Sequence, residues 1–309
     1  EDLVAEIPGE GTDTVISSVT HTLGDSVENL TLAGAGAISG TGNALDNSLT
    51  GNGEANVLDG GAGADLMTGG GGNDTYVVDN AGDYAEEYAG GGVDEMRSSV
   101  TCRLAPFVEN LTLTGTGAIN GSGNNLDNYL RGNDGANFLD GGFVDNGSDT
   151  LDGGPGADTL EGKGNNDVYL VDNAGDVVVE AVGAGSDTVL SSVSYTLGAG
   201  VEQLVLVGAS AAAGTGNSDN NVLVGNGGDN TLDGGGGRDT MTGGAGNDVF
   251  VVNVAGDVVI ERDGEGVDTV RSSITHALGE NVENLILTGT GVIDGSGNGL
   301  DNILEGNGS

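Results

Sequence analysis

The chain has 309 residues, among them 63 glycines and no tryptophan, and only 3% are aromatic, so it lacks the large side chains that fill a compact globular core. Its 48 acidic and 7 basic residues give a formal net charge of −41. This charge excludes a basic surface for nucleic acid and disfavours anionic membranes. No apolar run approaches the ~20 residues of a membrane helix, and the single cysteine, Cys102, excludes an intramolecular disulfide.

A long internal repeat organises the sequence. The segment at Val27–Leu32 recurs at offsets of 81, 93 and 81 residues, and the longer offset contains a twelve-residue insertion from Phe143 to Gly154. Tandem modules of about 81 residues are therefore predicted. The predicted boundaries are the end of a truncated module at 1–10, module 1 at 11–91, module 2 at 92–184 with an extra turn at 143–154, module 3 at 185–265 and a partial module 4 at 266–309. Because both ends lie within a repeat, we expect a segment of a longer protein.

The first half of each module is rich in Val, Thr and Leu. Its alternating pieces, such as Gly11–Val19, predict strands of six to ten residues with a break at Leu23-Gly24-Asp25. The doublet Ser17-Ser18 recurs in each module without an accompanying base, which indicates a packed or hydrogen-bonded strand position. Glu28 and its copies are expected on the solvent face.

The second half of each module has a nine-residue repeat. Gly60–Thr68 and Gly69–Val77 each contain a glycine-rich run, an acid at the sixth position and a large apolar residue at the eighth. The glycines permit tight turns with positive φ, and the apolar residue belongs to a very short strand. Two units make a coil of eighteen residues, and neighbouring strands lie ~4.8 Å apart. Acids eighteen residues apart should therefore stack at about that distance.

Stacked carboxylates favour a bound cation. They repel by about 1 kcal/mol per pair in water and by several times more when partly dry. Calcium, whose oxygen ligands lie at ~2.3–2.6 Å, fits between two turns. The predicted aspartate ligands at the sixth position, or in phase with it, are Asp65, Asp74, Asp83, Asp149, Asp158, Asp167, Asp176, Asp239, Asp248 and Asp257. By charge, the best pairs are Asp65/Asp83, Asp149/Asp167, Asp158/Asp176 and Asp239/Asp257.

Other polar residues keep the same phase. Asparagine occupies the ligand position of the earlier turns at Asn56, Asn137 and Asn230, where it either holds calcium weakly or forms a hydrogen-bonded turn without metal. A last group of aspartates is formed by Asp13, Asp94, Asp187 and Asp268. The upstream Glu6, Glu87, Glu180 and Glu261 either close a further site with this group or are solvated turn acids.

This nonapeptide resembles the RTX (hemolysin-type) calcium-binding repeat. The resemblance implies an all-β fold without significant helix, a right-handed parallel β-roll or β-solenoid with several structural calcium ions in its turns. It also implies ligation by turn carbonyls, such as those of Gly60, Ala62, Gly69, Gly71, Gly153 and Gly234. A chain of this family is exported unfolded by type I secretion and folds on meeting external calcium.

No catalytic constellation is visible. The two histidines, His21 and His276, share a module position with Cys102 and Tyr195, which indicates a surface strand position rather than a base or a ligand. No Ser/His/Asp set and no zinc-ligand spacing can be built from them. The chain is therefore predicted not to be an enzyme.

The leading hypothesis is a calcium-binding structural or adhesive segment of a large secreted protein, extracellular or at the cell surface and monomeric. The sequence does not identify a carbohydrate or cell-surface partner. One alternative is the non-catalytic RTX-like part of a secreted protease, lipase or epimerase. A weaker alternative is an ice-binding solenoid, which requires an outward threonine ladder, whereas Thr31, Thr112 and Thr288 occur once per module.

Overall fold

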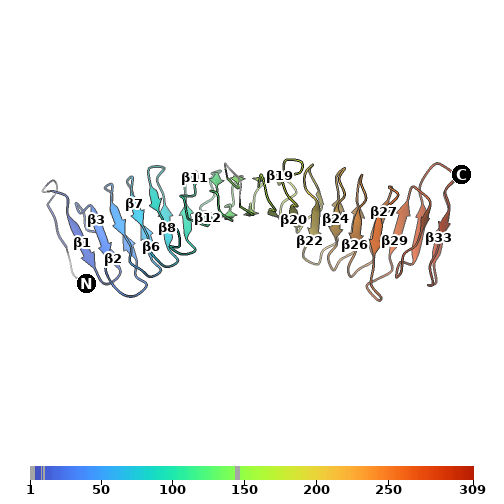
Figure 1. Ribbon diagram of the computed structural model, residues 1–309, viewed down its shortest axis with the longest axis horizontal. Coiled ribbons are helices and arrows are strands. Elements are labelled where there is room, and N and C mark those ends of the chain that lie inside the picture. The colour runs from blue at the N-terminus through green and yellow to red at the C-terminus, as the bar shows by residue number, and fades with distance from the viewer. Residues whose placement is uncertain (1–3, 8, 10, 143–146) are drawn as a thin grey trace. The chain divides into compact units, whose positions relative to one another are not determined.

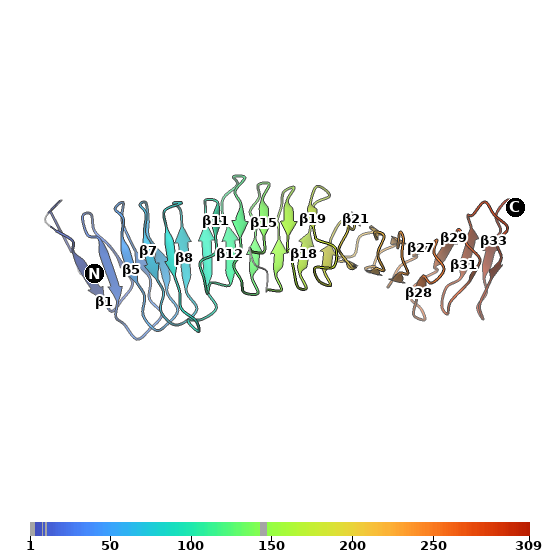
Figure 2. The same ribbon diagram turned by 45° about the horizontal axis from the view of Figure 1, so that its top comes forward.

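The computed structural model describes residues 4–7, 9, 11–142 and 147–309. Every regular element in these ranges is a β-strand, and no helix occurs in them. The chain forms two compact units, Glu1–Gly162 and Lys163–Ser309, called unit 1 and unit 2 here. Figures 1 and 2 show the strands of each unit as the rungs of successive coils. The predicted all-β parallel solenoid is confirmed, while the module boundaries stay a prediction.

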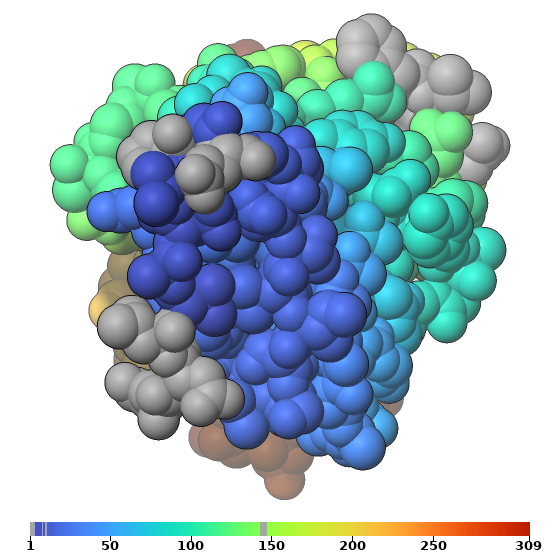
Figure 3. Space-filling model, turned by 90° about the vertical axis from the view of Figure 1, so that its left-hand side faces the viewer, coloured from blue at the N-terminus to red at the C-terminus, as the bar shows by residue number. Residues whose placement is uncertain are grey.

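Unit 1 alternates odd- and even-numbered strands, which pair in separate parallel sheets. Figure 3 shows the surface of the chain with the N-terminal part of this unit, in blue, toward the viewer. The odd strands form two sheets with a break after β9: β1 (Thr14–Ser17), β3 (Asn29–Leu32), β5 (Ser48–Thr50), β7 (Leu66–Thr68) and β9 (Tyr84–Glu86), then β11 (Cys102–Arg103), β13 (Gly121–Ser122), β15 (Phe138–Asp140) and β17 (Thr159–Glu161). The even strands are β2 (His21–Thr22), β4 (Gly40–Thr41), β6 (Val57–Asp59), β8 (Thr75–Val78), β10 (Glu95–Ser98), β12 (Asn110–Leu113), β14 (Tyr129–Arg131) and β16 (Thr150–Asp152).

Unit 2 is built in the same way. Its even strands are β18 (Val168–Val171), β20 (Thr188–Ser191), β22 (Gln203–Leu206), β24 (Val222–Val224), β26 (Thr240–Thr242) and β28 (Val258–Ile260), followed after a break by β30 (His276–Ala277) and β32 (Gly295–Ser296). Its odd strands are β19 (Val177–Val179), β21 (Tyr195–Thr196), β23 (Ala213–Thr215), β25 (Thr231–Asp233), β27 (Val249–Val252), β29 (Thr269–Ser272), β31 (Asn284–Leu287) and β33 (Ile303–Glu305).

The length of a coil varies along each unit. In the glycine-rich half of a module the register joins Val57 to Thr75, eighteen residues apart, as the two nines predict. The next coil joins Thr75 to Glu95, which is two residues longer. The coil after it joins Glu95 to Asn110 and has only fifteen residues. Unit 2 repeats the long and short coils in its register of β27, β29 and β31. The coil length of eighteen residues that two nonapeptides predict therefore does not hold where one module meets the next.

Equivalent strands of the first two modules lie on opposite sides of the coil. The sequence repeat places β12 where β3 stands one module earlier, and nine strands separate them. Because nine is odd, β3 belongs to an odd-strand sheet and β12 to the even-strand sheet of unit 1. The insertion in module 2 adds one further strand, β16. Residues 143–146 of the predicted extra turn lie outside the described residues.

The core is a thin column of side chains, as the composition predicts. Met67 and Tyr76, at the eighth positions of two nonapeptides, are both 0% exposed. Leu49, Met67 and Ala85 follow one another in register on the odd side of unit 1. Each coil therefore buries its apolar row against its neighbours, which is the packing of a solenoid.

The prediction of strands of six to ten residues is wrong. The segment after Gly11 contains two short strands, Thr14–Ser17 and His21–Thr22. Ser17 Oγ donates to the Val19 carbonyl at 2.7 Å and accepts from the Val19 N–H at 3.3 Å. This local bonding turns the chain and ends the strand. The serine doublet is thus a corner, and the same contacts recur at Ser98, Ser191 and Ser272.

Candidate metal centres

The sixth-position acids are positioned by backbone N–H groups of the preceding coil. Asp65 Oδ1 accepts a hydrogen bond from the Asn47 N–H at 2.7 Å, and Asp74 Oδ1 accepts one from the Asn56 N–H at 2.7 Å. Unit 2 has the same contacts at Asp239 and Asp248. Residues eighteen apart therefore contact one another as predicted, and one oxygen of each carboxylate is fixed by the fold.

The second oxygen of these carboxylates has no donor. The Oδ2 atoms of Asp65, Asp74 and Asp94 are buried without a hydrogen-bond partner, and their side chains are at most 1% exposed. The same holds for Oδ2 of Asp239 and Asp248. A buried charged oxygen without a partner is costly. A cation supplies the missing partner, and carboxylate oxygens are the ligands that calcium prefers.

Burial perturbs the titration of these acids. Loss of solvation is the largest cause, and it raises the pKa of Asp65, Asp74, Asp94 and Asp248 to about 6. Burial, together with the charge of Asp268, raises the pKa of Glu261 to about 7. At neutral pH most of these groups would carry a charge that their surroundings disfavour, which is the electrostatic setting of a cation site.

The asparagine turns are held by hydrogen bonds. Asn56 Oδ1 accepts from the Asn52 N–H at 2.8 Å, and Asn56 Nδ2 donates to the Ile38 carbonyl at 2.7 Å. Asn137 and Asn230 make the corresponding contacts. These bonds favour the interpretation as hydrogen-bonded turns, and metal ligation by Asn56, Asn137 and Asn230 stays a prediction.

The acids in the Ala-Gly-Asp segments use both oxygens within the protein. Asp83 accepts from the Asp65 N–H through Oδ1 at 3.1 Å, and from the Asp79 and Asn80 N–H groups through Oδ2 at 3.1 and 3.0 Å. Asp257 does the same in its own turn. The pairs Asp65/Asp83 and Asp239/Asp257 are therefore in contact, but the second acid of each caps its own turn. Their role as ligands stays a prediction.

The module with the insertion shows the same ladder within unit 1. Asn128 N–H donates to Asp149 Oδ1 at 2.8 Å, and Asn137 N–H donates to Asp158 Oδ1 at 2.7 Å. The predicted pairs Asp149/Asp167 and Asp158/Asp176 each join a residue of unit 1 to one of unit 2. These two pairs stay predictions, as does ligation by the turn carbonyls of Gly60, Ala62, Gly69, Gly71, Gly153 and Gly234.

The densest groups of acids occur at the long coils, where the sequence hypothesis placed none of its best pairs. Among the residues that the structure describes, three groups, called the junction clusters here, have one carboxylate oxygen from each residue within 4.8 Å of the others. They are Asp74–Glu87–Asp94, Asp167–Glu180–Asp187 and Asp248–Glu261–Asp268. From the sequence these glutamates either close a further site with the last aspartates or are solvated turn acids, and the structure places Glu87, Glu180 and Glu261 beside those aspartates. Their convergence follows the twenty-residue coil, which the nonapeptide period does not predict.

Further contacts hold the first junction cluster together. Asp74 N–H donates to Asp94 Oδ1 at 2.8 Å, and Asp94 N–H donates to Glu109 Oε2 at 2.8 Å. Glu28 accepts from the Asp13 N–H in the same way, so the expectation that Glu28 and its copies lie simply on the solvent face is wrong. They are half-buried residues that position the last aspartate of the ladder.

A buried tyrosine borders each of the first two junction clusters. The hydroxyl of Tyr76 donates to Glu87, and that of Tyr169 donates to Glu180. In the third cluster the equivalent residue is Phe250, which is 0% exposed. Burial and the neighbouring carboxylate raise the pKa of Tyr76, so its hydroxyl stays protonated and remains a donor.

Gly69 leaves room for the first junction cluster. A Cβ at this position would collide with the hydroxyl of Tyr76, Oδ2 of Asp74 and Oε1 of Glu87. We expect Gly69→Ala to lower the free energy of unfolding of the calcium-bound chain by about 1–3 kcal/mol through overpacking. Urea denaturation measures this change. Gly53→Ala is the matched control, because a Cβ at Gly53 meets no atom within 4 Å. Equal effects of the two changes would contradict the packing argument.

The raised pKa values predict that acid stabilises the calcium-free fold. Folded-state pKa values near 6 for Asp65, Asp74 and Asp94 exceed the ordinary value of 3.8, so the folded state binds more protons between these two pH values. Stability is then fully present below about pH 4 and falls as pH rises through 6. Far-UV circular dichroism in calcium-free buffer should show more β structure at pH 5 than at pH 7.5. A β signal that grows with pH would refute this expectation.

A known repeat family matches part of the chain. The RTX calcium-binding nonapeptide repeat matches four segments, residues 41–76, 122–143, 143–178 and 215–250. The chain carries RTX calcium-binding nonapeptide repeats. The matched segments contain the first aspartate of every junction cluster, whereas Glu87, Glu180, Glu261 and the second aspartates lie beyond them. No curated protein matches the chain.

The RTX repeat accounts for the turn chemistry found here. Calcium is the ion of this repeat, and the buried acids with an oxygen lacking a hydrogen-bond partner fit it. The described residues contain no helix long and apolar enough to cross a membrane. His21, Cys102, Tyr195 and His276 are half-buried in two-residue strands, so they lie less openly on the surface than the sequence suggested.

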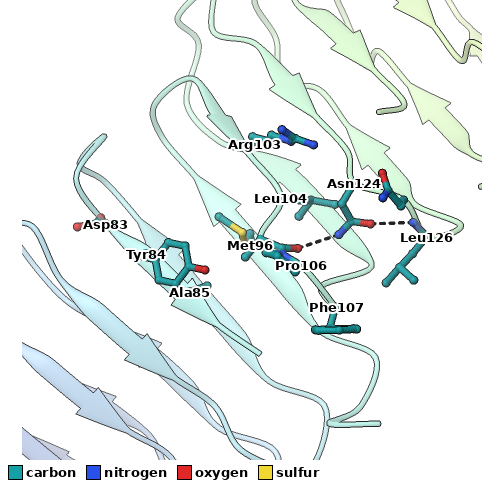
Figure 4. A pocket seen from close by; sticks show the side chains of 12 residues that line it. Asp83, Tyr84, Ala85, Met96, Arg103, Leu104, Pro106, Phe107, Asn124 and Leu126 are labelled. Carbon is teal, nitrogen blue, oxygen red and sulfur yellow. Dashed lines mark hydrogen bonds between the residues drawn. The ribbon is translucent and has the colours of Figure 1, made fainter. Parts of the chain in front are cut away.

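Unit 1 also has a cavity of about 530 Å³ beside the break between β9 and β11 (Figure 4). Tyr84, Met96, Leu104 and Phe107 supply much of its apolar lining, and Asn124 holds the adjoining loop through its hydrogen bond to the Ala105 carbonyl at 2.8 Å. Its lining contains no serine, cysteine or histidine. The cavity therefore has no nucleophile–base pair of the kind used in acyl transfer.

Proposed function

We propose that this chain is a calcium-dependent structural or adhesive array of a large secreted protein, which folds when it meets calcium outside the cell. The observation that carries the proposal is the series of buried carboxylate oxygens that have no hydrogen-bond partner, at Asp65, Asp74 and Asp94 in unit 1 and at Asp239 and Asp248 in unit 2. These oxygens recur along each unit at the sites where the coils stack.

Calcium binding to such a series couples directly to folding. Each site that exists only in the folded chain adds roughly RT ln(1 + [Ca]/Kd), about 2.7 kcal/mol at a hundredfold excess over Kd. Sites of extracellular modules work near ~10⁻⁴–10⁻³ M, a concentration far above that of the cytosol. The net charge of −41 opposes folding until cations bind. These terms support a chain that stays unfolded inside the cell and folds after export.

A calcium titration tests this proposal. The full chain in calcium-free buffer at neutral pH should lack a β-type far-UV circular dichroism spectrum and gain one cooperatively as calcium reaches roughly 10⁻⁴–10⁻³ M. Magnesium at the same concentration is the control for ionic strength and charge. A β spectrum that persists without calcium at neutral pH would overturn calcium-driven folding.

The ice-binding alternative is disfavoured. Thr31, Thr50 and Thr68 do stack in register on the odd side of unit 1. The row ends at Ile16 on one side and at Glu86 on the other. Thr112 lies in the even-strand sheet, because its strand, β12, is nine strands after β3. A flat threonine ladder of useful length is therefore not formed in this unit.

A further inference from the structure

The long coil needs an explanation that the RTX repeat does not supply. By the eighteen-residue rule, the residue stacked on Asp74 would be Gly92, whereas the observed partner is Asp94, whose Oδ1 accepts the Asp74 N–H. The chain between them holds the Asp83 turn and Glu87, and both lie outside the residues that match the RTX repeat. A short coil of fifteen residues follows at once. An interaction is needed that holds this register and prevents a shift to a coil of eighteen residues.

The side chains at this place leave a charge without compensation. In the first and third junction clusters, the acids form no ion pair with a described basic residue. Oδ2 of Asp74 and of Asp94 are buried without a hydrogen-bond partner. In the third cluster, Oδ2 of Asp248 and Oε2 of Glu261 are in the same situation. Three carboxylates this close repel one another strongly in a partly dry site.

The donor set selects a hard cation. Carboxylate oxygens favour calcium, magnesium or manganese over softer metals, and calcium accepts the irregular geometry of three carboxylates supplemented by carbonyls and water. Gly69 and Gly243 keep the space beside the clusters open, since a Cβ at either would collide with the cluster's oxygens. The site is thus built to leave room for an ion rather than for a side chain.

We propose that each junction cluster binds one calcium ion at a site that joins the acid of the last nonapeptide turn to residues beyond the repeat, and that this ion locks the register of the twenty-residue coil. The inference rests on the proposed function, because the same ion is involved. What the inference adds is a second class of calcium site. Glu87, Glu180 and Glu261 are its distinguishing ligands, each supplied by the segment that follows the matched repeats.

Terbium provides a probe that reports mainly these sites. Tb³⁺ takes the oxygen ligands of calcium and emits when a nearby excited tyrosine transfers energy to it. The chain has no tryptophan and six tyrosines. Tyr76 and Tyr169 donate directly to the glutamates of the first two clusters, and Phe250 makes the third cluster silent. Tyrosine-sensitised emission of the full chain should therefore rise with Tb³⁺ and fall when calcium competes.

Variants separate the junction sites from the nonapeptide turns. Glu87→Gln with Glu180→Gln should weaken the sensitised Tb³⁺ binding by about 10–100-fold, on the scale of lost metal-site contacts. Glu86→Gln is the matched control, because Glu86 accepts from Thr68 Oγ1 on the outer side of β9. Tyr76→Phe with Tyr169→Phe should remove most of the emission. Phe250→Tyr should add emission from the third cluster, and this gain does not depend on any loss of folding.

The outcomes are distinguishable from those of the calcium titration. If the unmodified chain shows no calcium-dependent circular dichroism, the proposed function itself fails. If circular dichroism responds to calcium while the emission ignores Glu87→Gln/Glu180→Gln, Tyr76→Phe/Tyr169→Phe or Phe250→Tyr, the junction sites are refuted and the nonapeptide sites stand. Loss of emission in the glutamine and phenylalanine variants, with a gain in Phe250→Tyr, supports the junction sites.

Discussion

Replacing Met67 with alanine is expected to lower the free energy of unfolding of the calcium-bound chain by about 2–5 kcal/mol. Met67 is 0% exposed and lies in register between Leu49 and Ala85. Its removal leaves a cavity between two coils. The column is thin and holds few large side chains per coil, so few neighbours can move to fill that cavity.

The adjacent residue supplies the control for this change. Leu66 belongs to the same strand, β7, but points outward and is 39% exposed. Leu66→Ala should cost less than about 1 kcal/mol, as surface substitutions usually do. Urea denaturation of both variants in saturating calcium measures the difference. Similar losses for the two variants would mean that the column of apolar side chains is not the main source of stability in the coil.

The position of Met67 shows how much of the fold the sequence could predict. The eighth residue of each nonapeptide is apolar, and the structure buries Met67 and Tyr76 at that place. The stacking of Asn56 on Asp74 follows from the eighteen-residue coil, and the structure contains that contact. These features depend on local period alone, so one repeat is enough to predict them.

The structural features where two modules meet could not be predicted from the nine-residue period. The serine corner at Ser17 forms through a side chain that bonds to Val19, and the composition of the segment resembles a longer strand. Glu87 meets Asp74 only because the connecting coil has twenty residues rather than eighteen. The available signal was the constant phase of Glu6, Glu87, Glu180 and Glu261. Phase alone does not tell a ligand from a solvated acid, because that difference depends on burial.

The change of side between the first two predicted modules follows from the number of strands in the first. Residues 11–91 contain nine strands, β1 to β9. An odd number of strands moves the next module to the other side of the coil, as β3 and β12 show. A surface feature that occurs once per module changes faces wherever a module supplies an odd number of strands, as the first module does. An adhesive role is consequently better served by a site within one module than by a row along the array.

Substitution of Asp94 by asparagine should change stability in opposite directions with and without calcium. Asp94 is 0% exposed, and its Oδ1 accepts the Asp74 N–H. An asparagine oxygen can keep that bond while its amide donates toward the carboxylates of Asp74 or Glu87. Without calcium, the change removes one buried charge from a repelling group. The calcium-free folded state should therefore become more stable.

With calcium the same change should be harmful. The junction cluster loses one charged ligand, and a loss of about 100-fold in affinity at that site corresponds to about 2.7 kcal/mol. Because contacts in a solenoid are made mainly between neighbouring coils, the loss should be concentrated in β8 and β10, which pair across the long coil. Hydrogen exchange of the amides of Thr75–Val78 and Glu95–Ser98 in saturating calcium measures it locally.

Asp134→Asn is the matched control for Asp94→Asn, since Asp134 is exposed and the exchange of aspartate for asparagine removes the same charge. It should leave the protection of β8 and β10 unchanged in calcium. If Asp94→Asn lowers stability equally with and without calcium, Asp94 acts only as a hydrogen-bonded turn residue. A gain without calcium combined with a loss in calcium requires a cation at this acid, because no contact within the protein alone changes sign when calcium is added.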